Sequence, residues 1–163
     1  MSMILYLKPT TDSEIENLIK DPSTIEDYLD TDEGIDSMDL DKSWHGIHFL
    51  LTNSEWEGPE PLCYLLSGGT TIGDIDVGYG PARAITSQQV CSFETELAKI
   101  DKTELRKRFN PTSMTAKEIY PSIWDRSIEE DDTIGYLCSY FAELQAFVKT
   151  TNENKNGLVI WMG

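Results

Sequence analysis

The stretch "LDKSWHGIHFLLTN", residues 40–53, carries the pattern of a buried helix. Its apolar residues recur at intervals of three and four, which places them on one face of an α-helix. Phe49 and His48 widen this face toward the core. We therefore expect a largely buried helix that ends near Asn53. The apolar positions of this face are Leu40, Trp44, Ile47, Leu50 and Leu51.

The only two histidines of the chain, His45 and His48, both lie in this stretch. Residues three positions apart on a helix can face the same direction, and Asp41 is one turn away from His45. The geometry therefore allows the two histidines to bind one metal ion. A zinc site needs a third or fourth ligand, however, and the sequence contains no specific candidate for it. We predict no metal and no other cofactor.

The two histidine rings have different sequence neighbours. His48 is flanked by Ile47 and Phe49, so we expect a buried ring with a hydrogen bond. His45 lies on the more polar flank of the helix, and we expect it at the surface. Replacing His48 by alanine should then destabilise the fold, whereas replacing His45 should have almost no effect.

Upstream of this helix, "MILYLK" is rich in residues that favour strands, and we expect a strand over 3–8. "PTTDSE" follows with candidate caps, and the apolar spacing of "SEIENLIKD" indicates a helix from about Asp12. A second short helix is expected over 23–29. "DTDEGIDSMD" is too polar to pack, so we predict a loop that leads to a helix cap at Asp39 or Asp41.

Downstream of the helix, prolines and a glycine in "SEWEGPEP" interrupt the pattern. Five glycines from Gly68 to Gly80 indicate an irregular loop that enters a strand near Ala82. Helical patterns dominate the rest of the chain. The expected elements are a short helix over 62–67, a strand over 82–86, helices over 87–99, 101–110 and 130–151, a loop over 118–127, and a strand over 158–163.

These elements define the expected fold class. Strands and helices do not alternate regularly, which disfavours a doubly wound α/β fold. We predict an α+β fold that is mostly helical, with a small sheet of short strands that includes both termini. The chain has 163 residues and 39% hydrophobic content, so we predict a single domain over residues 1–163.

Several features of the sequence bear on the cellular compartment. The first ten residues lack a basic region and a cleavage site, so we expect no secretory signal. No apolar run approaches the roughly 18 to 20 residues that a membrane span needs. Cys63, Cys91 and Cys138 have apolar neighbours, and we expect buried free thiols in a reducing compartment. We predict a soluble, cytoplasmic protein.

The charge of the chain is strongly negative. It has 29 acidic and 13 basic residues, a formal net charge of -16. Nucleic-acid binding is disfavoured, because such proteins need cations to displace the counterions around phosphate. Anionic membrane surfaces are disfavoured for the same reason. We therefore predict neither nucleic acid nor membrane as a partner.

The acidity is concentrated in one segment. Residues 12–41 contain twelve carboxylates and a single lysine, Lys20, a local net charge of -11. Such a run is commonly a solvated face that keeps a protein soluble. It can also steer a basic partner, such as a toxin domain, into contact. For the second alternative, the predicted partner-binding residues are Asp30, Asp32, Glu33 and Asp36.

Motifs of catalytic chemistry are missing from the sequence. It contains no Gly-x-Ser-x-Gly, no Cys-x-x-Cys and no Walker lysine after its glycine-rich loop. We interpret the glycines as structural: Gly78 and Gly80 permit unusual backbone angles, Pro81 fixes the exit, and Arg83 pairs with a carboxylate. We assign no catalytic residue. If a small ligand binds, the candidate residues are Trp44, His48, Tyr79 and Arg83.

Three stretches together resemble a known family. They are "LDKSWHGIHFLLTN", "GGTTIGDIDVGYGPARAIT" and "ELRKRFNPTSMTAKEIYPSIW", after the start "MSMILYLK". In this order they resemble the YfbM-like family, a bacterial domain of unknown function, over nearly the whole chain. The resemblance implies an α+β fold and brings no settled catalytic residues. The matching positions are Trp44, His48, Tyr79, Gly80, Pro81, Arg83, Tyr120 and Pro121.

Two functions remain open at this point. The first is a non-catalytic acidic interaction protein, most concretely an immunity protein that neutralises a bacterial toxin by binding it. Members of the YfbM-like family are sometimes placed beside toxin genes, which leaves this role open for some of them. The alternative is a small-molecule binder or enzyme whose pocket lies where the helix with Trp44 and His48 meets the turn with Tyr79 and Arg83.

Overall fold

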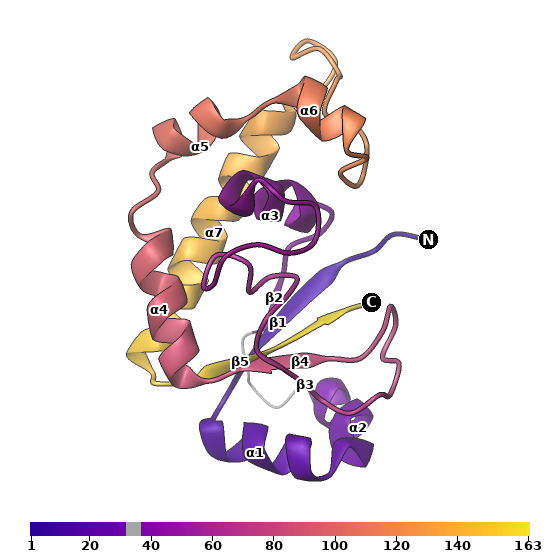
Figure 1. Cartoon of the computed structure of the whole chain (residues 1–163), viewed down its shortest axis with the longest axis vertical. Coiled ribbons are helices and arrows are strands. Elements are labelled where there is room, and N and C mark those ends of the chain that lie inside the picture. The colour runs from indigo at the N-terminus through magenta and orange to yellow at the C-terminus, as the bar shows by residue number, and fades with distance from the viewer. Residues whose placement is uncertain (32–36) are drawn as a thin grey trace.

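The chain builds a five-stranded antiparallel sheet with helices around it (Figure 1). The structure is a computed structural model that describes residues 1–31 and 37–163. The strand order is β2-β1-β5-β4-β3, so the strands near the two termini are central neighbours. Leu5 lies opposite Met162 and Thr10 lies opposite Gly157. The strands are β1 Leu5–Thr10, β2 Met38–Asp39, β3 Thr70–Thr71, β4 Arg83–Ile85 and β5 Gly157–Met162.

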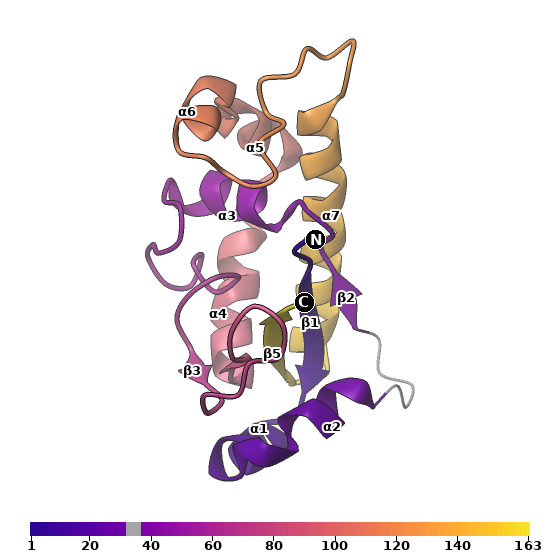
Figure 2. The ribbon, with the colours of Figure 1, turned by 90° about the vertical axis from the view of Figure 1, so that its right-hand side faces the viewer.

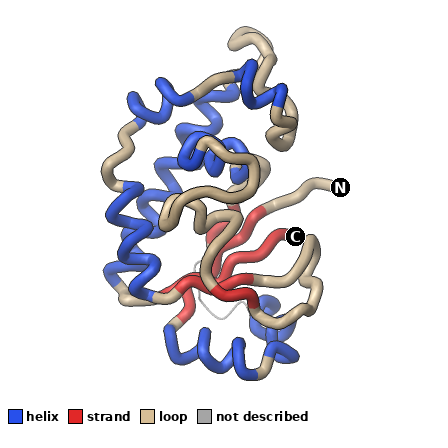
Figure 3. The backbone as a smooth tube through the Cα atoms, viewed as in Figure 1, coloured by secondary structure: helices blue, strands red, loops and turns tan. Residues whose placement is uncertain are grey.

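The helices lie on both faces and at the ends of this sheet (Figure 3). α1 and α2 lie at one end of the molecule, and α5 and α6 lie at the other (Figure 2). Their bounds are α1 Asp12–Lys20, the 3-10 helix η1 Pro22–Thr24, α2 Ile25–Asp30, α3 Trp44–Thr52, α4 Ser87–Leu97, α5 Lys102–Arg108, α6 Pro111–Ala116 and α7 Thr133–Glu153.

Alternating side chains of the sheet enter two separate cores. Leu158 and Ile160 of β5 pack with α3, α4 and α7 in the larger core. Val159 and Trp161 point to the opposite face and pack with α1 and α2, which contribute Ile15 among others. This follows from the two-residue repeat of a strand. Because both faces are covered, β5 reads as one continuous apolar run.

The predicted α+β fold is confirmed, including the strands near both termini and the buried helix α3. The segment 62–67, predicted as a helix, forms successive turns instead. α6 was not predicted, because Asn110 and Pro111 were interpreted only as the end of the preceding helix. The Asn110 side chain accepts the Ser113 N–H at 3.1 Å, and proline is favoured in a first helical turn.

The cysteines are free, and two of the three are buried as predicted, Cys63 and Cys138. Cys91 is exposed, so its predicted burial is wrong. α4 buries Val90 and Phe93, and Cys91 follows Val90 by one position, which is about 100° around the helix. Among the helices of the described residues, none is both long and apolar enough to cross a membrane.

Candidate functional site

Trp44 is part of the core at the start of α3. Its side chain is fully buried, and its indole N–H donates to the Met3 carbonyl at 2.9 Å. The ring stacks on His45 and on Tyr120, with centroids 4.9 and 5.4 Å apart. Trp44 therefore joins α3 to the N-terminal segment and to the segment before α7, and it does not line any of the clefts described below.

His45 is buried, so the prediction of a surface residue is wrong. Its Nδ1 accepts the Tyr120 backbone N–H at 2.9 Å, and Nε2 lies 2.7 Å from the Glu55 carbonyl. Since Nδ1 is the acceptor, Nε2 carries the hydrogen and donates it to Glu55. Burial lowers the pKa of His45, in agreement with a neutral ring held between two backbone groups.

His48 is fully buried, as predicted, and its Nε2 lies 2.9 Å from the Glu57 carbonyl. Burial lowers the pKa of His48 to about 4, so the ring is neutral at pH 7. Its Nδ1 has no hydrogen-bond partner among the described residues. Both histidines thus fasten the segment after α3 through its carbonyls. No group of three or more potential metal-ligating side chains occurs in the part of the chain that the structure describes.

Arg83 of β4 holds a loop to the sheet through backbone carbonyls. Its Nη1 donates to Gly68 at 2.9 Å. Its Nη2 donates to Tyr64 at 3.0 Å and to Leu65 at 2.7 Å. Burial lowers the pKa of Arg83 to about 10, so it is still a cation at neutral pH. The prediction of a carboxylate partner is wrong, because no ion pair within residues 1–31 and 37–163 includes Arg83.

The glycine turn after β3 has the predicted structural role and presents Tyr79 to solvent. Gly78 has φ +151°, and a Cβ there would lie 2.5 Å from the Met162 carbonyl oxygen. Asp76 Oδ1 accepts the N–H groups of Gly78 and Gly80, both at 2.9 Å, and these bonds lower the pKa of Asp76. The Tyr79 N–H donates to Met162 at 3.0 Å, while its side chain is 44% exposed.

Tyr79 and Arg83 line one cleft of about 270 Å³, which we call the Arg83 cleft. Trp44 and His48 are not among its lining residues, so the structure brings together two of the four predicted ligand-binding residues. Trp56, 55% exposed, takes the place of Trp44 in the wall. The sequence signal that was missed is a tryptophan within an otherwise polar segment rich in proline and glycine.

A second pocket lies on the opposite face of the sheet, and we call it the acidic pocket. Tyr6 and Trp161 are directly opposite each other on β1 and β5, and their rings stack with centroids 5.2 Å apart. Three exposed carboxylates surround this pair, and the pocket has a volume of about 370 Å³. Its lining residues are Tyr6, Glu26, Leu29, Asp30, Asp76, Val77 and Trp161.

The carboxylates of the acidic pocket have no cationic partner among the residues that the structure describes. Glu26 and Asp30 are one turn apart on α2, and Asp76 comes from the glycine turn. None of the three forms an ion pair within the described residues. Of the four predicted partner-binding residues, only Asp30 is placed here. The other three, Asp32, Glu33 and Asp36, lie outside the described residues.

Comparison with known proteins assigns the fold to a family. Residues 1–161 match the family described as Domain of unknown function (DUF1877), and the chain belongs to this family. It is 28% identical over 129 residues to Protein YfbM of Escherichia coli (strain K12), covering 76% of this chain and 75% of that protein. The resemblance to the YfbM-like family is thereby confirmed.

A solved structure also matches this fold over almost its entire length. It is the crystal structure of a protein of unknown function, YfbM from Escherichia coli. The TM-score is 0.76 at 22% identity, and the match covers 98% of this chain and 99% of the other. At this identity the likeness concerns the fold.

Proposed function

We propose that this chain is a non-catalytic interaction protein that binds a basic segment of a protein partner in the acidic pocket. One observation carries the proposal: the stacked rings of Tyr6 and Trp161 are surrounded by three carboxylates that have no cationic partner within the described residues. An immunity protein that occludes a basic toxin domain is one form of this function. We infer a cytoplasmic setting for it, which the three free cysteines support.

The chemistry of the pocket fits an arginine side chain of the partner. A guanidinium group over an aromatic face is attracted by the ring, and it donates paired hydrogen bonds to carboxylates. Its planar shape matches the stacked pair of Tyr6 and Trp161 better than a compact ammonium group does. The apolar neighbours Leu29 and Val77 can contact the methylene stem of the arginine.

The surroundings of the pocket favour the approach of a basic partner. Within the acidic segment, the stretch from α1 to α2, residues 12–30, carries seven carboxylates and one lysine, Lys20. None of these carboxylates forms an ion pair with another described residue. The net field of such a surface raises association rates with cations, and salt weakens it. Steering by the surface and recognition in the pocket thus act in the same direction.

A pair of short peptides tests the recognition step. We would titrate the protein with acetyl-Gly-Arg-Gly-amide and, as the matched control, with the same peptide containing citrulline, which has a similar shape but no charge. We expect saturable shifts of the Trp161 indole N–H resonance with the arginine peptide and at least about fivefold weaker binding of the citrulline peptide. Equal binding of both peptides, or no response of Trp161, would contradict the proposal.

A second candidate function is the binding of a small aromatic anion in the Arg83 cleft. It is favoured by one observation, the cation of Arg83 beside Trp56 and Tyr79 with no carboxylate partner in the described residues. Benzoate and the neutral benzamide are suitable probes. Binding of benzoate that quenches Trp56 fluorescence, absent with benzamide, would support this function, and no difference between the two would reject it.

A further inference from the structure

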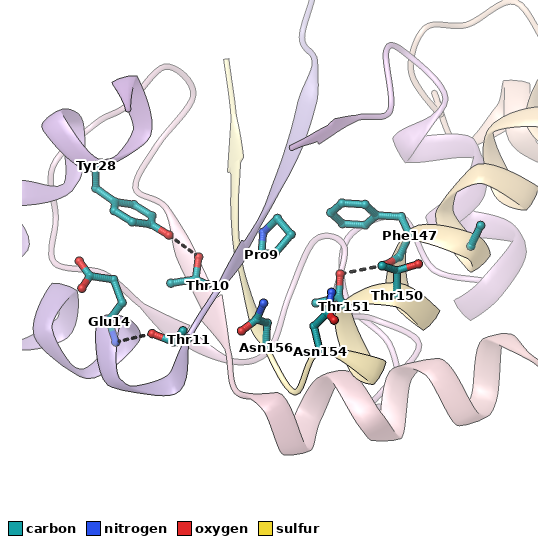
Figure 4. A pocket seen from close by; sticks show the side chains of 11 residues that line it. Pro9, Thr10, Thr11, Glu14, Tyr28, Phe147, Thr150, Thr151, Asn154 and Asn156 are labelled. Carbon is teal, nitrogen blue, oxygen red and sulfur yellow. Dashed lines mark hydrogen bonds between the residues drawn. The ribbon is translucent and has the colours of Figure 1, made fainter. Parts of the chain in front are cut away.

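A third cleft, of about 700 Å³, lies where α1 and α2 approach the C-terminal end of α7 (Figure 4). Its floor is the end of β1, and side chains of the helices form its two walls. It shares no lining residue with the acidic pocket or the Arg83 cleft. The described residues that line it are Pro9, Thr10, Thr11, Glu14, Tyr28, Ala146, Phe147, Thr150, Thr151, Asn154 and Asn156.

The floor of this cleft does not favour a peptide strand as its occupant. Within the described residues, β2 pairs only with Tyr6 and Leu7 of β1, so that the β2 side of β1 is not paired at Pro9. Proline has no N–H group, and a strand added beside Pro9 would lack a donor there. We therefore consider a small molecule rather than an added strand.

Some polar groups of the cleft are already satisfied within the fold. The Thr10 hydroxyl donates to the Lys8 carbonyl at 3.0 Å, so the Tyr28 hydroxyl donates to Thr10 at 2.7 Å (Figure 4). The Thr151 hydroxyl donates to the Phe147 carbonyl at 2.8 Å. The Tyr28–Thr10 bond ties α2 to the end of β1, whereas the Thr151 bond lies within α7. These hydroxyl groups therefore already have partners in the structure without a ligand.

Other polar groups of the cleft have no hydrogen-bond partner in the described part of the chain. The side chains of Glu14, Asn154 and Asn156 form no hydrogen bond with another described residue, and all three line the cleft (Figure 4). Together they present carboxylate acceptors and amide groups that both donate and accept. Phe147 and Pro9 also line the cleft and supply an apolar surface. The cleft thus combines an apolar surface with mixed hydrogen-bonding groups.

The charge of the lining selects against anions. Glu14 is the only charged side chain among the described lining residues, and burial raises the pKa of Tyr28, which therefore stays neutral. Lys8 is not in the lining, and its ammonium group donates to the Tyr28 and Thr31 carbonyls at 2.6 and 2.9 Å. An anionic ligand would meet a carboxylate without a compensating cation in the lining.

We infer that this cleft binds a neutral polyhydroxylated ligand of the mono- or disaccharide class. The C–H face of a pyranose ring is apolar and can pack on Phe147 and Pro9. Sugar hydroxyls donate and accept at once, as the groups of Glu14, Asn154 and Asn156 require. The cleft volume of about 700 Å³ lies within the range of small-molecule sites.

A panel of probes followed by backbone amide chemical shifts tests the ligand class. The neutral sugars are glucose, N-acetylglucosamine and maltose, and the contrasting probes are glucose 6-phosphate and adenosine. We expect saturable shifts at residues 10–14 and 146–156 with at least one neutral sugar, and about tenfold weaker binding of glucose 6-phosphate than of glucose. No saturable shift with any of the sugars, or tighter binding of the phosphate or of adenosine, would overturn the inference.

Two variants test the roles of the lining residues. Glu14→Gln keeps the size of the side chain and should remove most of the discrimination against glucose 6-phosphate. Asn156→Ala should weaken binding of the responding sugar about tenfold. Asn152→Ala, on α7 but outside the lining, is the matched control and should leave binding unchanged. Glu14→Gln removes no side-chain hydrogen bond between described residues, so this variant should fold. If it still discriminates against glucose 6-phosphate as strongly as the natural sequence does, the inference is overturned. This test holds even if Asn156→Ala fails to fold.

Discussion

At the residue scale, the two histidines of α3 show where local sequence is informative and where it is not. His48 was predicted to be buried from its immediate neighbours, and it is. His45 was assigned to the surface because its partners are distant: Glu55 is 10 positions away and Tyr120 is 75 positions away. When both ring nitrogens bond to backbone groups far away in the sequence, the spacing of residues within the helix does not indicate that the ring is buried.

Both histidines should therefore contribute to stability. His45→Ala leaves the Tyr120 N–H and the Glu55 carbonyl without partners, and His48→Ala removes a buried ring and its bond to Glu57. We expect each variant to lose about 1 to 3 kcal/mol in the free energy of unfolding. Urea denaturation measures this loss, with the exposed Gln88→Ala as control. A His45→Ala variant as stable as the control would contradict the bridging role.

The free energy of unfolding should depend on pH through His48. Its pKa is about 4 in the fold, below the value of 6.5 expected for the unfolded chain. As pH falls, the unfolded state binds the proton first, so stability is complete above about pH 6.5 and is lost progressively toward pH 4. The shift corresponds to about 3 kcal/mol.

Urea denaturation between pH 7 and pH 4.5 measures this dependence. Acidification also relieves repulsion among the carboxylates, so the comparison is with His48→Gln, which shares that contribution. We expect the free energy of unfolding to fall more steeply with decreasing pH in the natural sequence than in the variant. Parallel curves for the two proteins would show that His48 does not titrate between the folded and unfolded states as described.

At the scale of the elements, helices with long apolar faces were predicted correctly, whereas very short strands that depend on a neighbouring strand were not. α3 and α7 carry extended apolar faces, and their positions followed from spacing. β2 and β3 have two residues each and exist only because β1 and β4 lie beside them. Arg83 was expected to find a carboxylate in this acidic chain, but its guanidinium group donates instead to the carbonyls of Tyr64, Leu65 and Gly68. Buried backbone carbonyls need such donors, and this need leaves no mark in the sequence around Arg83.

The glycine turn offers a matched pair of substitutions. Gly78→Ala places a Cβ 2.5 Å from the Met162 carbonyl oxygen, whereas a Cβ at Gly80 meets nothing within 4 Å. Both glycines have positive φ, so both variants are strained in the backbone. We expect a loss of about 1 kcal/mol for Gly80→Ala and at least about 2 kcal/mol for Gly78→Ala in thermal or urea unfolding. The reverse order would contradict this account of the turn.

Loss of Arg83 should release the turns that it holds. Arg83→Met keeps much of the stem but removes three hydrogen bonds to carbonyls, a loss of about 3 kcal/mol. Amide hydrogen exchange should accelerate first over residues 62–72, before the strands β1 and β5 exchange. Arg106→Met, at an exposed position of α5, serves as control. Unchanged exchange in residues 62–72 would rule out this anchoring role.

At the scale of the whole molecule, the acidic pocket combines parts of the chain that sequence reasoning treats separately. The acidity of residues 12–41 was evident from composition, and Asp30 was selected from it. The aromatic floor could not be predicted, because Tyr6 and Trp161 become neighbours only when β1 pairs with β5. Asp76 arrives from the glycine turn. A charged segment becomes a candidate binding surface through long-range pairing of the two terminal strands.

The central claim is that the acidic pocket, rather than acidity in general, recognises a basic side chain. The most direct measurement is the dissociation constant of acetyl-Gly-Arg-Gly-amide for two double variants of equal charge. Glu26→Gln with Asp30→Asn removes two carboxylates from the pocket, whereas Glu16→Gln with Asp27→Asn removes two exposed carboxylates outside it. We predict about tenfold weaker binding for the first variant and less than about twofold for the second. Equal weakening in both would contradict the claim and reduce the pocket to part of a diffuse negative surface.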